Sequence, residues 1–167
     1  MTKFFLAVHV LAAILAVGPV AVAASMFPSA ARRVPDRGAA DRGAAGRGTG
    51  AGGVATLRVL HRICRVYAVA GLAVPVFGFA TASGLGVLRD AWVIASILLT
   101  AAAAAILALA VLPRQDAVLA RLTAGDSTPA DAGDGVARLA MLTGVFNLLW
   151  AAVTVLMIVR PGSTTGV

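Results

Sequence analysis

Four stretches of this chain run for 21 to 24 residues without a charged side chain, and they limit the possible folds more than any other feature. They are residues 4–27, 66–88, 91–112 and 139–159. As α-helices they would be about 32 to 36 Å long, enough to cross a hydrocarbon core of about 30 Å. Lipid offers the backbone no hydrogen-bond partners, and the stretches lack the alternation of barrel strands. We therefore predict an all-α polytopic membrane protein, a single membrane domain over 1–167 with four transmembrane helices in an antiparallel bundle.

The composition supports the same class of protein. Hydrophobic residues make up 60% of the 167-residue chain and charged residues only 13%, with a mean hydropathy of +0.94. Soluble domains have about 25% charged residues, so a water-soluble enzyme domain, a disordered chain and a coiled coil are all excluded. The single cysteine, Cys64, excludes an intramolecular disulfide and a cysteine-based zinc site.

The connections between the four stretches differ in length. Arg89 and Asp90 alone separate the second stretch from the third, which predicts a tight helical hairpin. Residues 29–53 are rich in Gly, Ala and Arg and contain a tandem repeat, 36–40 and 41–45, so we expect a flexible loop there. Residues 113–138 carry several aspartates and two prolines and are expected to form a polar loop.

The basic residues are distributed unequally between the two sides of the predicted bundle. Three of them lie on the side of the termini, and eleven lie in the first and third connections. The positive-inside rule places the eleven in the cytoplasm, which predicts a plasma-membrane protein with both termini outside. This orientation accounts for the net charge of +7 without a nucleic-acid partner. A cleavable signal ending at Ala23 is the alternative for the first stretch, but its 24 residues exceed the usual 7 to 15.

His9 is an ionisable residue within the first predicted span and is therefore a candidate cofactor-binding residue. Its helical neighbours Ala12, Ala13 and Ala16 would let another helix approach, so we expect the imidazole to face the bundle. It could be a haem or copper ligand, a proton-relay group, or a neutral imidazole bonded across a helix interface. His61 lies on the opposite side of the membrane in this topology, about 20 Å away, which argues against a haem held by both histidines.

Polar side chains in the fourth span fall on one helical face and predict an interhelical polar cluster. Asn147 lies near mid-membrane, where lipid cannot satisfy its amide. Ser96 and Thr100 on the third span are the expected partners. The predicted cluster consists of Thr143, Asn147, Thr154, Ser96 and Thr100. Structural hydrogen bonding is the favoured interpretation, and a ligand or ion path is the alternative.

Residues 56–67 predict an amphipathic extension of the second helix on the cytoplasmic side. Arg58, Arg62 and Arg65 share one face, which we expect to be a basic patch that faces anionic lipid headgroups. Cys64 on this helix is expected to be an inert thiol or an occasional palmitoylation site.

The segment His9-Val10-Leu11-Ala12-Ala13, followed by Val17-Gly18, resembles the first helix of a group of small bacterial integral membrane proteins. Many of these form an uncharacterised actinobacterial-type family with about four spans, and their first helix is similar to that of copper-resistance D-like membrane proteins. Ala16 and Pro19 stand where that group typically has a Trp and a second Gly. The resemblance implies a four-span layout and a metal or haem contact at His9.

The sequence therefore predicts an integral membrane protein that is a non-catalytic accessory or assembly component. No phosphate-binding loop, dinucleotide fingerprint or catalytic triad pattern is present, so an enzyme is not favoured. We expect no cofactor unless His9 binds haem or copper, which would make the chain a redox or metal-handling protein. A small oligomeric transporter is the other alternative. The expected partners are the lipid bilayer, its anionic headgroups, and a second copy or another membrane subunit.

Overall fold

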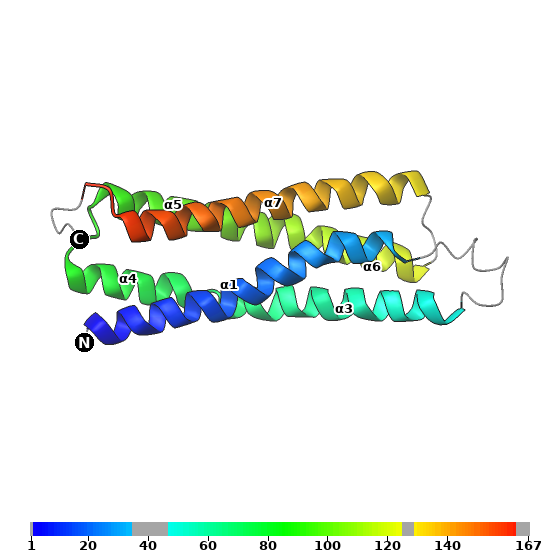
Figure 1. The fold of residues 1–167 in the computed structure, drawn as a ribbon, viewed down its shortest axis with the longest axis horizontal. Coiled ribbons are helices and arrows are strands. Elements are labelled where there is room, and N and C mark those ends of the chain that lie inside the picture. Colours follow the sequence, from blue (N-terminus) through cyan, green and yellow to red (C-terminus); the bar gives the residue numbers. More distant parts are fainter. Residues whose placement is uncertain (1, 35–46, 125–128, 163–167) are drawn as a thin grey trace.

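The computed structural model describes residues 2–34, 47–124 and 129–162 and consists of four long helical rods. The described residues form no strand, and each rod is long and apolar enough to cross a membrane, so the predicted all-α four-helix bundle is confirmed. The rods are α1 (Thr2–Arg32), α3 (Arg47–Ala70) with α4 (Ala73–Leu85), α5 (Ala91–Ala105) with the π-helix η1 (Ile106–Val111) and α6 (Leu112–Ala124), and α7 (Pro129–Val159). They run alternately in opposite directions, so the start of α1 and the end of α7 lie at the same end of the bundle, which we call the end of the termini (Figure 1).

The second rod is interrupted at Gly71 and Leu72 because of a proline. Pro75 has no N–H, so the Gly71 carbonyl loses its usual helical donor and accepts instead from the Val74 N–H at 3.0 Å. Helical geometry resumes as α4, which ends at Leu85. Gly86 follows with a φ of +72°, a left-handed conformation that suits glycine. The turn to Asp90 then joins α4 to α5 as the predicted hairpin.

The core lies along the middle of the bundle, and much of the outer surface is apolar. Phe27, Leu57 and Leu139 are fully buried, each on a different rod. By contrast, Leu148 and Leu109 are 72% and 78% exposed. An apolar surface of this extent would be unfavourable in water, but it is the surface that lipid requires.

The predicted loops are wrong at their edges, because the helices continue beyond the apolar stretches. The loop predicted at 29–53 loses its first residues to α1, which reaches Arg32, and its last residues to α3, which begins at Arg47. The loop predicted at 113–138 is largely replaced by α6 and by the start of α7. The tandem repeat over 36–45 and residues 125–128 lie outside the described residues. The predicted spans stop at the first charged residues. In the structure the helices continue, because these charged residues lie on an outer face while the opposite face buries apolar side chains.

Three of the four rods have 31 to 34 residues and are about 46 to 51 Å long, whereas the hydrocarbon core is about 30 Å thick. The bundle must therefore project beyond the core by about 15 to 20 Å. The projection lies at the end opposite the termini, where the apolar stretches stop and the arginines begin (Figure 1). We call this part the basic head; it comprises residues 28–32, 52–65, 112–124 and 134–138.

Candidate functional site

His9 is held between α1 and α4. Its imidazole is 8% exposed, and Nδ1 lies 2.8 Å from the Val74 carbonyl oxygen. A carbonyl only accepts hydrogen bonds, so Nδ1 carries the proton of this bond, and Nε2 takes no part in it. Gly78 supplies the space for the ring, because a Cβ at that position would lie 2.8 Å from His9 Cε1.

This geometry fits a metal ligand in one respect. Ligating histidines commonly donate the other ring N–H to a carbonyl, as His9 does to Val74. Other ligands do not converge on His9, since no three His, Cys, Asp or Glu side chains come together in the part of the chain that is described. His61 lies thirteen residues before Val74 along the same rod, about 20 Å away. The described residues therefore bring no second histidine to the level of His9.

A second polar group, which we call the head cluster, lies inside the basic head and consists of His61, Cys64, Gln115 and Asp116. His61 Nδ1 donates to Gln115 Oε1 at 3.0 Å, and Gln115 Nε2 donates to the Cys64 sulfur at 3.7 Å. His61 Nε2 lies 3.0 Å from Asp116 Oδ1, but without the geometry of a hydrogen bond. Gln115 is fully buried and Asp116 is mostly exposed, so the cluster joins α3 to α6 from core to surface.

The sequence reasoning missed Gln115 and Asp116 because it placed them in a loop. Helical spacing could have found Gln115, since Val111 and Val118 are four and three residues away on the same face. Val111 is fully buried, and Val118 packs against the core. Burying an uncharged amide among apolar residues requires a partner on the facing helix, and His61 provides it.

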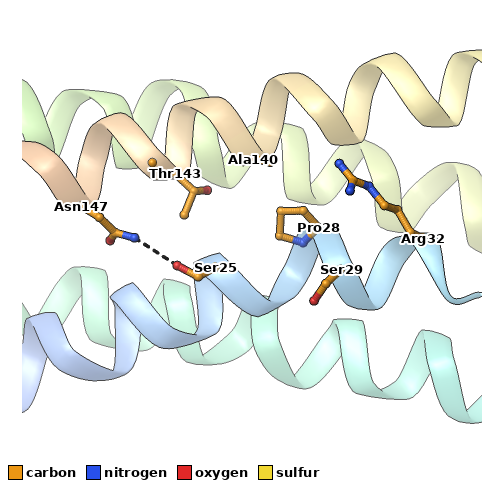
Figure 2. A pocket seen from close by; sticks show the side chains of 8 residues that line it. Ser25, Pro28, Ser29, Arg32, Ala140, Thr143 and Asn147 are labelled. Carbon is orange, nitrogen blue, oxygen red and sulfur yellow. Dashed lines mark hydrogen bonds between the residues drawn. The ribbon is translucent and has the colours of Figure 1, made fainter.

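A third polar feature is a groove between α1 and α7, which we call the α1–α7 groove (Figure 2). It has a volume of about 260 Å³ and is lined by Ser25, Pro28, Arg32, Thr143, Gly144 and Asn147 among others. Asn147 Nδ2 donates to Ser25 Oγ at 3.0 Å, and Arg32 reaches from α1 toward α7 (Figure 2). Thr143 Oγ1 and Asn147 Oδ1 are buried and have no hydrogen-bond partner.

The groove replaces the predicted interhelical polar cluster, whose expected pairing is wrong. Asn147 bonds to Ser25 on the first rod and not to Ser96 or Thr100 on the third. Ser96 and Thr154 donate to carbonyls four residues earlier in their own helices, Trp92 and Trp150 respectively. A hydroxyl that is satisfied within its own helix has no need of a partner on another helix, which is why the cluster does not assemble.

The predicted basic patch faces outward on α3. Arg58, Arg62 and Arg65 are exposed, whereas Leu57 and Cys64 on the opposite face are fully buried. The helix is therefore amphipathic over this range, as the sequence predicts. The burial of Cys64 within the head cluster explains why its thiol should be inert.

Comparisons with known proteins leave these features to be interpreted on their own geometry. The chain matches no protein-family model, no curated protein and no solved structure. The resemblance of its first helix to copper-resistance D-like membrane proteins therefore stays a prediction.

Proposed function

We propose that this integral membrane protein is a non-catalytic accessory component of the plasma membrane, whose basic head lies in the cytoplasm against anionic lipid headgroups. The observation that carries the proposal is the head itself, a helical projection with a packed polar interior and an arginine-rich surface. Its exposed arginines include Arg58, Arg62 and Arg65 on α3 and Arg121 on α6. The outer end carries far fewer bases, which supports an orientation with both termini outside.

The arginines of the basic patch are attracted to the surface of an anionic leaflet. Each arginine near an anionic membrane contributes on the order of 1 kcal/mol, so the three patch arginines together contribute about 3 kcal/mol. This attraction decays within a Debye length of about 8 Å at physiological salt. Only side chains close to the headgroups take part, and residues 58–65 directly precede the apolar stretch that begins at residue 66.

Cysteine labelling in intact cells tests the orientation. In a Cys64→Ala background, Pro161→Cys should react with a membrane-impermeant maleimide, because Pro161 is exposed at the end of the termini. Ala120→Cys, which is exposed on α6, should react only after the membrane is permeabilised. The opposite labelling pattern would overturn the proposed orientation.

Thermal unfolding in lipid nanodiscs tests the proposed role of the head. Adding phosphatidylglycerol to phosphatidylcholine should raise the melting temperature of the wild type at low salt, and high salt should abolish the increase. The triple substitution of Arg58, Arg62 and Arg65 by Gln should lose most of the increase, whereas Arg160→Gln at the opposite end should keep it. Equal responses of the two variants would contradict the proposal.

A metal-handling or redox role at His9 is the second candidate, because the Nδ1 bond to Val74 leaves Nε2 available and the first helix resembles the copper-resistance group. Metal analysis and the visible absorption spectrum of the purified protein test it. Bound copper or haem that is lost in His9→Ala would favour this candidate, and a metal-free, colourless wild type would count against it.

A further inference from the structure

We propose that the α1–α7 groove is a binding site for one anionic glycerophospholipid, with the lipid phosphate at Arg32 and its ester region at Thr143 and Asn147. The proposal rests on the orientation proposed above, which puts Arg32 at the cytoplasmic headgroup level. It differs from the attraction at the basic patch, because it assigns a single lipid to a built site between two helices.

The first observation is that the groove contains buried polar atoms without partners. Thr143 is 2% exposed, lines the groove, and its Oγ1 makes no hydrogen bond. Elsewhere in the bundle, Thr81 and Thr154 donate to the carbonyl four residues earlier in their own helices. Thr143 does not, although a buried unsatisfied hydroxyl costs about 1 to 3 kcal/mol. The hydroxyl is therefore available to a molecule that enters the groove.

The Asn147 amide offers a second such group. In the structure it donates to Ser25 Oγ and leaves Oδ1 without a partner. If the amide turns over, the Ser25 hydroxyl can donate to Oδ1, and the N–H groups then face the groove instead. With the amide in that orientation, Thr143 and Asn147 present two donors one helical turn apart, which suits the acceptor-only oxygens of ester carbonyls.

The charge of the groove selects an anion. Arg32 belongs to the basic head, lies at that end of the groove and reaches toward α7 (Figure 2). The residues that line the groove include no carboxylate to neutralise it. Arg33 and Arg138 are exposed at the same end, so an ammonium headgroup would meet additional positive charge. Guanidinium groups bind phosphate oxygens in bidentate geometry, which suits a phosphodiester at this position.

The depth and walls of the groove match a lipid and not a small soluble anion. Ser25 is seven residues from Arg32, so the polar lining extends about 10 Å toward the membrane interior. Beyond it, the same face of α1 continues with Val22, 60% exposed, three residues before Ser25. On α7, Val155 is 58% exposed two turns beyond Asn147. An acyl chain can run along this apolar continuation while the ester and phosphate groups lie in the polar part above it.

Native mass spectrometry of the full chain, released from nanodiscs of mixed phosphatidylcholine and phosphatidylglycerol, tests the site. The wild type should retain one phosphatidylglycerol in preference to phosphatidylcholine. Arg32→Gln should weaken this retention about tenfold, because it removes a charge-assisted contact. Thr143→Val, which replaces the hydroxyl by a methyl group, should weaken it about fivefold, and Thr143→Ser should restore it.

Arg58→Gln is the matched control, since it removes one exposed arginine from the same end of the bundle but from α3, outside the groove. The proposed site would be refuted if Arg58→Gln and Arg32→Gln lost equal retention of phosphatidylglycerol. It would also be refuted if Thr143→Val retained the lipid as the wild type does. If the groove holds only water, the wild type will retain no lipid. If the groove binds a soluble anion, excess glycerol phosphate will displace the lipid. Either result refutes the proposal. Circular dichroism should show that each variant is folded. The triple arginine substitution should keep the retained lipid while losing the salt-sensitive stabilisation, so failure of the groove and failure of the head can be distinguished.

Discussion

The contact between His9 and Gly78 gives the sharpest test of how α1 packs on α4. A Cβ added at Gly78 would lie 2.8 Å from His9 Cε1 and 3.0 Å from Nδ1, whereas carbon atoms in contact are normally about 3.5 to 4.0 Å apart. In Gly78→Ala the ring must therefore move, and moving it breaks the 2.8 Å bond from Nδ1 to the Val74 carbonyl. Overpacking of this kind costs about 1 to 3 kcal/mol.

Alanine also has a higher helix propensity than glycine, which offsets part of the overpacking cost in Gly78→Ala. A second Gly→Ala variant, at a position without overpacking, corrects for this gain. Replacing a helical glycine by alanine stabilises by about 0.5 to 1 kcal/mol when nothing is in the way. Gly135 on α7 is such a position, since an added Cβ would meet nothing within 4 Å and no proline follows it. The difference in unfolding free energy between Gly135→Ala and Gly78→Ala should therefore isolate the overpacking cost, about 1 to 3 kcal/mol.

Thermal unfolding in detergent, followed by circular dichroism, measures the difference, and His9→Ala completes a double-mutant cycle. Once the imidazole is removed, the added methyl group at Gly78 has room, so Gly78→Ala in the His9→Ala background should behave like Gly135→Ala. The reasoning would be refuted if Gly78→Ala melted at or above the temperature of Gly135→Ala. It would also be refuted if the penalty at Gly78 persisted without the imidazole.

Three further predictions concern the other polar contacts. Asn147→Leu should lower the unfolding free energy in detergent by about 0.6 to 1.7 kcal/mol. The loss should be smaller in a Ser25→Ala background, because the two side chains share one hydrogen bond. Additive losses would contradict the pairing. Gln115→Leu should cost about 1 to 3 kcal/mol because it leaves His61 Nδ1 without its acceptor. Adding His61→Leu should then recover part of the loss, and a further full loss would argue against the bond. Maleimide should modify Cys64 in the folded protein far more slowly than after denaturation in dodecyl sulfate, and rapid modification of the folded form would contradict its burial.

The four spans could be predicted from the sequence because lipid imposes a simple requirement on it. A helix that crosses the hydrocarbon core must avoid charge for about twenty residues, and this chain does so four times. The ends of the helices could not be predicted in the same way. Beyond the core, a helix needs only one buried face, and the arginines of α3 lie on the other face, opposite Leu57 and Cys64. Charge therefore marked the membrane boundary and not the helix boundary.

The partners of the polar side chains were harder to predict than the side chains themselves. The sequence indicated that His9 and Asn147 need satisfaction within the bundle, but not which rod supplies it. Ser25 was overlooked because a lone serine in an apolar stretch carries no pattern, and Gln115 because the segment around it was assigned to a loop. The partners of Ser25 and Gln115 depend on which helices are neighbours, and four antiparallel rods can be arranged in more than one way.

The observed pairings suggest how that arrangement is specified. Among the described residues, side-chain hydrogen bonds join α1 to α4 through His9, α1 to α7 through Asn147, and α3 to α6 through His61. Each bond lies at a different level along the bundle, and the bond between His61 and Gln115 lies in the basic head. Apolar contacts between helices gain little over contacts with lipid tails, so they do not by themselves select neighbours or register. A polar group that would otherwise be unsatisfied does select them, because a wrong partner or a shift of one turn leaves it unpaired in the hydrocarbon.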